Sequence, residues 1–312
     1  MTVLVGCSLN NTAKPATPAD RAAYLANLPA AGKVVTKLTV GDGASSAGAT
    51  VTAGSTLYVP NRNDGTVSRI DTAANKVVAT IPIGGTVDAV AVAGKGMVFS
   101  SPTKDLKSLV VVDPATNQVV KTVNLDGMTY SLAGNEGALF ASAPKSDRLT
   151  RIDPNTLQIV KTWPIPRATY IAIGAGGVWV GLYNSKKVAR IDPGTDQQVA
   201  TVNVGAKPIS IVVGDGSVWV ANFGDYTVSR IDPGTNKVAG TLDIGIHPHS
   251  LAFAYGSLWV LGKDWLVRVD PKSGKAVQAL KMTGWGVTPA DGAIWVTDPT
   301  AKTATRIQPA AA

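Results

Sequence analysis

Residues 215–254, DGSVWVANFGDYTVSRIDPGTNKVAGTLDIGIHPHSLAFA, decide the fold because the stretch before them repeats their pattern. Residues 175–214 read AGGVWVGLYNSKKVARIDPGTDQQVATVNVGAKPISIVVG. Each stretch holds four short runs rich in β-branched residues, separated by glycine, asparagine and aspartate at turns. Four short strands in about 40 residues are typical of one blade of a β-propeller.

Two marker positions recur along the chain at spacings of 36 to 42 residues and count the blades. The first marker lies in a short apolar strand and is occupied by Tyr58, Val98, Phe140, Trp179, Trp219, Trp259 and Trp295. The second ends a later strand and is occupied by Asp71, Asp113, Asp153, Asp192, Asp232, Asp270 and Gln308. Both series have seven members, which predicts seven blades.

The ends of the repeat predict how the ring closes. Residues 33–41, KVVTKLTVG, match the third strand of the repeat, and residues 48–53, GATVTA, match the fourth. The last copy, residues 291–309, supplies two strands and stops. We therefore predict that residues 33–312 form an all-β, seven-bladed β-propeller of four-stranded antiparallel blades, closed by an N-terminal strand that completes the C-terminal blade. Residues 1–32 are expected to form a tail.

The composition fits a strand-rich protein with a large core. Hydrophobic residues make up 45% of the 312 residues and charged residues 16%, and Glu136 is the only glutamate. No run of 18 apolar residues occurs, so we expect no transmembrane helix. The net charge of +8 favours anionic partners, although it also fits a role in solubility alone. We expect a monomer.

Cys7 is the single cysteine, which excludes an internal disulfide. Its context, LVGC at residues 4–7 followed by a polar Ala-, Pro- and Thr-rich stretch, resembles the cleavage site and tether of bacterial lipoproteins, in which the cysteine is lipidated. Only six residues precede Cys7, and the basic start and apolar stretch of such a signal are missing. The alternatives are lipidation of a longer precursor or a chance match. Lipidation implies an extracytoplasmic, periplasmic or cell-surface protein anchored by lipid.

The copies that contain VWVAN (218–222) and TVSRIDPGTNKV (227–238) resemble the YVTN-type β-propeller repeat family. The resemblance covers residues 33–312. Members of this family are largely secreted or cell-surface proteins, many without an assigned reaction. The resemblance therefore implies a binding or interaction scaffold rather than a particular activity.

The repeats serve as internal controls, because a residue present in every blade is architectural. The arginine of the Arg-Ile-Asp element recurs as Arg69, Arg151, Arg190, Arg230, Arg268 and Arg306. We predict that these arginines brace neighbouring blades or turns and do not bind phosphate. The tryptophans of the VWV strands are interpreted in the same way, as packing between blades.

Positions that differ from blade to blade gather on one face of the predicted ring. Arg167, Lys207 and His247 occupy equivalent positions in blades 4 to 6, which predicts a basic arc at the channel mouth with aromatic residues between its members. The predicted ligand-binding residues are Arg62, Asp88, Tyr130, Arg167, Tyr183, Lys207, Phe223, His247, His249, Lys263, Trp265 and Trp285. We expect them to bind an anionic small molecule, single-stranded nucleic acid, an acidic glycan or a peptide carboxylate, without a cofactor.

His247 and His249 are the only histidines, and their period-two spacing puts both side chains on one side of a strand. A structural zinc site needs more ligands than this pair supplies. A weak Mg²⁺ or Ca²⁺ site that uses Asp88, Asp264 or Asp298 is one alternative. Loop histidines without a role are another.

The stretch HPHSLAF (247–253) resembles a Pro-His-x-apolar element at the same strand junction of the virginiamycin B lyase family. Those seven-bladed propellers open a cyclic depsipeptide by elimination with histidine and glutamate side chains and Mg²⁺. The resemblance implies a catalytic role for His249, with His247 beside it. The sequence departs from the family at Gly262 and Lys263, where a glutamate is wanted, and lacks a histidine from another blade. A Mg²⁺-dependent lyase, a lactonase-like hydrolase and a pure interaction scaffold therefore stand as alternatives to the binding protein that we favour.

Overall fold

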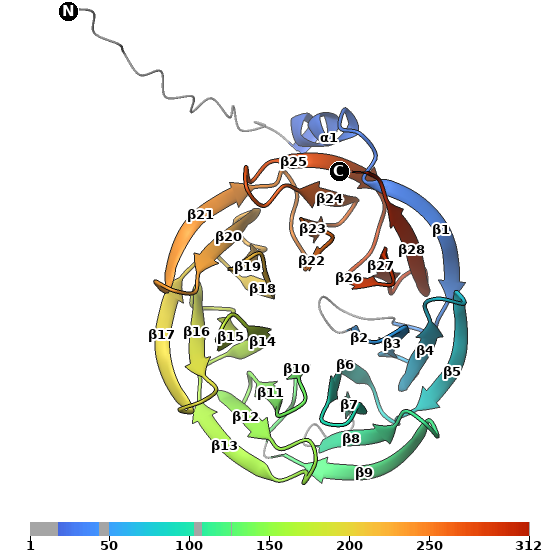
Figure 1. The fold of residues 1–312 in the computed structure, drawn as a ribbon, viewed down its shortest axis with the longest axis vertical. Helices are drawn as coiled ribbons and strands as arrows, with labels where there is room; N and C mark the ends of the chain where they lie inside the picture. The colour runs from blue at the N-terminus through green and yellow to red at the C-terminus, as the bar shows by residue number, and fades with distance from the viewer. Residues whose placement is uncertain (1–17, 44–49, 103–107, 126, 312) are drawn as a thin grey trace, which may run out of the picture.

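The computed structural model describes residues 18–43, 50–102, 108–125 and 127–311. In these residues, 28 strands form seven four-stranded antiparallel sheets arranged as a ring, with one short helix beside it (Figure 1). The predicted seven-bladed β-propeller is therefore confirmed. Cys7 lies outside the described residues.

Each blade runs from an inner to an outer strand in chain order, except the last. Blades 1 to 4 comprise β2 (Val51–Ala53), β3 (Thr56–Asn61), β4 (Thr66–Asp71) and β5 (Lys76–Pro82); β6 (Val87–Ala93), β7 (Met97–Pro102), β8 (Ser108–Asp113) and β9 (Gln118–Asn124); β10 (Ser131–Gly134), β11 (Leu139–Ala143), β12 (Arg148–Ile152) and β13 (Ile159–Pro164); β14 (Ala168–Gly174), β15 (Gly177–Leu182), β16 (Lys187–Asp192) and β17 (Gln197–Asn203). Blades 5 to 7 comprise β18 (Pro208–Gly214), β19 (Ser217–Asn222), β20 (Thr227–Asp232) and β21 (Lys237–Asp243); β22 (Ser250–Ala254), β23 (Ser257–Leu261), β24 (Trp265–Val269) and β25 (Ala276–Lys281); β26 (Gly286–Ala290), β27 (Ala293–Asp298), β28 (Thr303–Pro309) and β1 (Gly32–Thr39).

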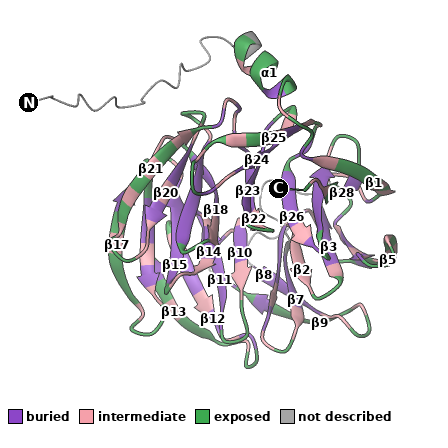
Figure 2. Cartoon of the chain, turned by 45° about the horizontal axis from the view of Figure 1, so that its top comes forward, coloured by how far each residue is buried: buried purple, intermediate pink, exposed green. Residues whose placement is uncertain are grey.

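Burial follows the position of each strand in its blade. All six residues of β15 and of β19 are buried, whereas five of the seven residues of the outer strand β17 are exposed and one is buried (Figure 2). The marker tryptophans Trp179, Trp219 and Trp259 are 0% exposed, and each donates its indole N–H to a carbonyl of its own blade. Trp179 also shares a core cluster with Val218 and Val220 of the next blade, so packing between blades explains the repeated tryptophans.

The ring closes through β1, which pairs antiparallel with β28 from Gly32 opposite Pro309 to Thr39 opposite Thr303. This pairing confirms the predicted N-terminal strand in the C-terminal blade. The helix α1 (Pro18–Ala26) lies within the predicted tail and packs beside β25 (Figure 1). Leu25 of α1 is 1% exposed in a core cluster shared with blades 5 and 6.

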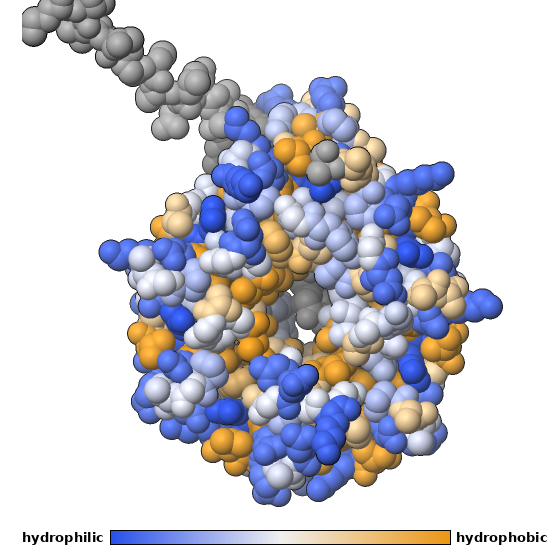
Figure 3. Space-filling model, in the orientation of Figure 1, coloured by the Kyte–Doolittle hydropathy of each residue, from blue (hydrophilic) through white to orange (hydrophobic). Residues whose placement is uncertain are grey.

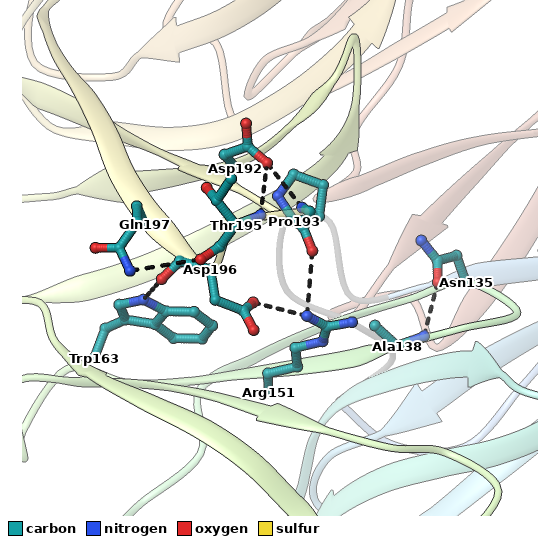
Figure 4. A network of polar contacts seen from close by, with 10 residues as sticks. Asn135, Ala138, Arg151, Trp163, Asp192, Pro193, Thr195, Asp196 and Gln197 are labelled. Atoms are coloured by element: carbon teal, nitrogen blue, oxygen red, sulfur yellow. Dashed lines mark hydrogen bonds and ion pairs between the residues drawn. The ribbon is translucent and has the colours of Figure 1, made fainter.

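In six of the seven blades the repeated arginine connects its own blade to the next one. Arg151 donates from Nη1 to the carbonyl of Pro193 at 3.3 Å and to Asp196 at 2.7 Å, and the indole of Trp163 donates to the carbonyl of Asp196 (Figure 4). Equivalent bonds run from Arg69 to Pro114, from Arg190 to Pro233 and from Arg230 to Pro271. These contacts confirm the structural interpretation. In blade 2 a valine, Val111, pairs with Phe99 where other blades place the arginine.

Candidate functional site

Each outer strand returns to the inner strand of the next blade on one face of the ring, which we call the variable face. The turns between second and third strands open on the same face because neighbouring strands are antiparallel. Arg167, Lys207 and His247 follow the outer strands β13, β17 and β21, so all three lie on this face in successive blades. Figure 3 shows the ring hollowed at its centre.

The inner half of the candidate site is a stack of three rings. His249 is only 4% exposed, and its imidazole lies on the indole of Trp285 with centroids 4.4 Å apart and planes 10° from parallel. Phe223 also packs against His249, with ring centroids 5.5 Å apart and ring planes tilted by 35°. The stack leaves Trp285 43% exposed, so the indole presents an open surface that is supported from behind.

The stack continues outward through the second histidine to the N-terminal helix. His247 lies 4.8 Å from Phe223 between ring centroids, and its Nδ1 donates to the Phe223 carbonyl at 3.0 Å. The ring of Tyr226 lies against His247, with centroids 3.4 Å apart. The guanidinium of Arg21, from α1, lies 5.3 Å over the Tyr226 ring and 3.9 Å from Asp243. The two histidines therefore belong to one aromatic column that ends on a cation.

His249 is held in its neutral form. Burial, reinforced by the nearby His247, lowers the pKa of His249 below its ordinary value of 6.5, although a hydrogen bond with the Gly284 backbone acts in the opposite direction. Within the described part of the chain, its Nδ1 has no hydrogen-bond partner. A neutral imidazole with one unused nitrogen can accept a hydrogen bond or a proton.

Tyr226 departs from the repeat at a strained backbone position. It has a φ of 61°, in the left-handed region, which costs a bulky residue about 1–3 kcal/mol. The equivalent turns of other blades place small or flexible residues in this conformation, namely Gly65, Asp147, Lys186 and Lys302. Sequence reasoning missed Tyr226 because a comparison of the repeat copies gives its place in the turn but not its φ.

An open cavity of about 350 Å³ lies between α1 and the loops of blades 5 and 6, and we call it the helix cavity. It is lined by Arg21, Ala22, Leu25, Tyr226, Gly245, Ile246, His247, Lys263, Asp264 and Trp265. Sequence reasoning placed His247, Lys263 and Trp265 at the site but missed Arg21, because α1 has no counterpart in the repeat.

A second open cavity of about 350 Å³ lies beside blade 7, and we call it the blade 7 cavity. It is lined by Lys263, Asp264, Thr283, Gly284, Trp285, Asp298, Thr300 and Ala301. The two cavities share Lys263 and Asp264, which sit in the turn between β23 and β24. Asp298, which the sequence offered as a candidate metal ligand, lines the same cavity as Lys263.

Asp298 is a buried carboxylate that is fully charged at neutral pH. It is 8% exposed and accepts hydrogen bonds from the Thr283 hydroxyl at 2.5 Å and from the amides of Thr300 and Ala301 at 2.9 and 3.0 Å. Burial alone would raise the pKa of Asp298, but these hydrogen bonds lower it below its ordinary value.

The other predicted residues lie elsewhere on the ring. The guanidinium of Arg62 pairs with the carboxylate of Asp88 at 2.5 Å, so these two charges offset each other. Tyr130 shares a hydrogen bond of 2.9 Å with the hydroxyl of Tyr170, whose pKa is raised by burial.

Tyr183 packs against the core cluster of blades 5 and 6. Arg167 and Lys207 are exposed, and neither lines the helix cavity or the blade 7 cavity. The site of Arg167 and Lys207 therefore stays a prediction.

In the described residues, no three histidine, cysteine, aspartate or glutamate side chains are grouped closely enough to hold a metal. The carboxylate oxygens of Asp298 are occupied by hydrogen bonds, and a side chain at Gly262 would begin 2.6 Å from the His247 carbonyl oxygen. The residues around His249 therefore do not fit a Mg²⁺ site.

No helix of the described chain has the length and apolar character needed to cross a bilayer.

No known family model and no curated protein sequence matches this chain. Solved structures do resemble it. Virginiamycin B lyase from Staphylococcus aureus superposes with a TM-score of 0.75 at 14% identity, over 88% of this chain and 98% of that chain. A catalytically inactive histidine-to-alanine variant of that lyase, with quinupristin, gives 0.74 at 14% identity over 88% and 98%. Hydrazine synthase from Kuenenia stuttgartiensis gives 0.72 at 15% identity over 88% and 97%. At these identities the likeness shows the β-propeller fold alone.

Proposed function

We propose that this protein binds a small organic anion with a flat apolar body in the helix cavity. The observation that carries the proposal is the meeting of two cations, Arg21 and Lys263, with the aromatic rings of Tyr226 and Trp265 around one cavity. This proposal narrows the expected anionic ligand to a small molecule and moves it from the channel mouth toward α1.

The charges that line the helix cavity favour an anion. Arg21 and Lys263 contribute two positive charges, and Asp264 contributes one negative charge. Asp243 lies 3.9 Å from the Arg21 guanidinium, so it offsets part of the Arg21 charge while the guanidinium lies over Tyr226. The net charge of +8 adds a long-range attraction for anions.

The walls of the cavity favour a flat apolar body. Leu25 and Ile246 are buried core residues whose surfaces reach the cavity, and Trp265 is partly buried against the same core cluster. Ligand sites commonly combine such apolar walls with a few charged groups that fix orientation. An aromatic carboxylate has an apolar ring for the apolar side chains and a negative charge for Arg21 and Lys263.

The test is calorimetric titration of the whole chain with indole-3-acetate and with tryptamine, which has the same ring system but carries an ammonium. We expect saturable binding of the carboxylate and not of the amine. Arg21→Gln should weaken carboxylate binding about fivefold, as expected for one partly exposed ion pair. Lys272→Gln, a matched change of an exposed cation on the opposite face, should leave it unchanged.

A second pair of variants tests the strained ring. Tyr226→Asn removes one aromatic wall and places a residue that tolerates the left-handed conformation, and Lys186→Asn makes the same exchange in blade 4. Binding should weaken only in Tyr226→Asn. Equal affinity for tryptamine, or undiminished binding in both Arg21→Gln and Tyr226→Asn, would count against the proposal.

A lyase is the second candidate function. It is favoured by the likeness to virginiamycin B lyase and by the buried, neutral imidazole of His249. Gly262 has no carboxylate, and the oxygens of Asp298 already accept hydrogen bonds, so these residues do not supply the base and the Mg²⁺ ligands that such a reaction would use. Incubation with quinupristin and Mg²⁺, followed by mass spectrometry, tests this candidate. Ring opening that is lost in His249→Ala would establish it in place of simple binding.

We also propose an extracytoplasmic location with a lipid on Cys7. The support is the LVGC context of Cys7 and the resemblance to a largely secreted repeat family. Metabolic labelling with a palmitate analogue in a bacterial host should mark the chain expressed as the longer precursor that this proposal requires, and not the Cys7→Ser variant of that precursor. Equal labelling of the two would remove this proposal.

A further inference from the structure

The blade 7 cavity has the opposite charge to the helix cavity. Asp264 and Asp298 contribute two negative charges to its lining, and Lys263 contributes one positive charge. Lys263 therefore adds to the positive charge of the helix cavity and offsets part of the negative charge of the blade 7 cavity. A cation, and not an anion, is the ligand that the blade 7 cavity favours.

The carboxylate of Asp298 has no ion pair among the described residues, and the positive charge that acts on it, that of Lys37, lies farther away. Asp298 is 8% exposed, and no lysine, arginine or histidine nitrogen of the described residues lies within 4.0 Å of it. Hydrogen bonds from Thr283, Thr300 and Ala301 keep it ionised but do not neutralise it. The ionised Asp298 therefore adds a negative charge to the cavity that no ion pair of the described chain offsets, and a cation from outside the chain can pair with it.

Asp298 also departs from the repeat. The equivalent last residue of the second strand is a neutral amide, Asn61, in blade 1 and Asn222 in blade 5. Those amides donate to hydroxyls of the neighbouring strand, from Asn61 to Ser68 and from Asn222 to Ser229. The fold therefore accepts an amide at this position, and the negative charge of Asp298 is not an architectural requirement.

Trp285 supplies an aromatic surface to the same cavity. Its indole is 43% exposed although His249 lies flat against it at 4.4 Å. The electron-rich face of an indole attracts cations, and tryptophan is the best of the aromatic residues for this contact. A carboxylate beside a supported indole is the combination that recognises organic cations.

We propose that the blade 7 cavity binds a quaternary ammonium group, held by Trp285 and by the charge of Asp298 with Asp264. The site is separate from the anion site under "Proposed function", although the two adjoin at Lys263.

Quaternary ammonium is favoured over other cations by the hydrogen bonds of the cavity. Both oxygens of Asp298 already accept hydrogen bonds, so little capacity remains for the N–H groups of a primary amine. The described residues hold no cluster of ligands for a metal ion. A trimethylammonium group needs only charge and an aromatic surface, and both are present.

The test is titration of the whole chain with choline and with 3,3-dimethyl-1-butanol, which has the same shape without the charge. We expect saturable binding of choline and none of the neutral molecule. Trp285→Leu should weaken choline binding about fivefold, as expected for the loss of one cation–π contact. Binding of indole-3-acetate should be unchanged in this variant.

Asp298→Asn tests the charge with the residue that the repeat itself uses at this position. We expect the variant to fold, as judged by its circular dichroism and melting temperature, and to bind choline about fivefold more weakly. Should Asp298→Asn fail to fold, Asp264→Asn, which changes an exposed residue, provides the same test of charge.

Lys263→Gln gives effects of opposite sign at the two cavities. Loss of the lysine should strengthen choline binding and weaken binding of indole-3-acetate, each about threefold, since one exposed charge is removed. Failure of the anion site alone would leave the choline results intact, so the two proposals are tested separately.

Any one of the following results would overturn the inference. They are equal binding of choline and its neutral analogue, choline binding that is undiminished in both Trp285→Leu and the aspartate variants, and displacement of choline by millimolar Mg²⁺. Absence of saturable choline binding would overturn it as well.

Discussion

His249 gives the site a pH dependence because its environment opposes its charge. Burial and the neighbouring His247 lower the pKa of His249 below 6.5, so the unfolded chain binds this proton more readily than the folded one. The stability that the neutral ring contributes is complete above the unfolded pKa. It is lost as the pH falls from about 6.5 through the lower folded pKa.

We therefore predict that His249→Phe reduces the acid sensitivity of the fold. Phenylalanine keeps a flat ring against Trp285 and cannot be protonated. Urea unfolding at roughly pH 7.5 and pH 5 should show a smaller loss of unfolding free energy in the variant than in the natural chain. The lowered pKa of Asp298 places its own titration below 3.8, outside this interval. An identical loss in both proteins would show that His249 does not titrate in this range.

Individual site residues could be predicted where a repeat copy offered a comparison. His247, His249, Lys263 and Trp285 stood out because the aligned positions of other blades hold different residues. Arg21 could not be found in this way, because α1 lies outside the repeat and is far from blades 5 and 6 in sequence. Contact across such a distance depends on ring closure, which carries Leu25 back to the core cluster of those blades.

The arginine of the third strand stabilises the contact between neighbouring blades. Arg190 donates to the Pro233 carbonyl at 2.6 Å and to Asn236 at 2.8 Å, and its guanidinium lies 5.0 Å over Trp179. Both of these bonds come from Nη1, and Nη2 donates to the Gly176 carbonyl at 3.0 Å, so the contacts use two nitrogens of the planar guanidinium, which an ammonium does not reproduce.

We predict that Arg190→Lys lowers the free energy of unfolding by about 1–2 kcal/mol, even though the charge is kept. Lys187→Ala, at an exposed position of the same strand, should change it by less than about 0.5 kcal/mol. Chemical denaturation of both variants provides the measurement. Equal stability of Arg190→Lys and the natural chain would mean that the connection between blades does not depend on this side chain.

The strands could be predicted because each recurs in seven copies at a similar spacing. A strand that is hard to recognise in one copy can be placed from the other copies. The clasp of β1 on β28 followed from the same count. Helix α1 was not predicted, because a single short amphipathic segment before the repeat resembles a polar tail in composition. Its docking depends on Leu25 and on the pairing of Ala30 with Ala279.

The closed ring depends on its N-terminal segment. A chain that lacks residues 1–40 loses the ladder between β1 and β28 and the burial of Leu25 and Val40. We predict a loss of about 3–6 kcal/mol from the buried side chains alone, with an exposed β28 edge that promotes aggregation. Thermal melting should show a large fall for the truncation and little change for Val35→Thr, which alters a side chain that is 51% exposed. An unchanged melting temperature in the truncated chain would contradict closure by β1.

Charged residues of the variable face separate the two proposed binding sites. The helix cavity gathers cations from α1 and blade 6, and the blade 7 cavity gathers aspartates, with Lys263 and Asp264 between them. The opposite face carries the repeated turns that the arginines brace. Ligand binding should therefore be confined to the variable face of blades 5 to 7.

The most direct test is a crystal structure of the whole chain soaked with indole-3-acetate. We predict that the indole lies between Trp265 and Tyr226 and that its carboxylate lies within hydrogen-bond distance of Arg21 or Lys263. A ligand bound on the opposite face, or a helix cavity that stays empty at a saturating concentration in an unobstructed lattice, would contradict the proposed function.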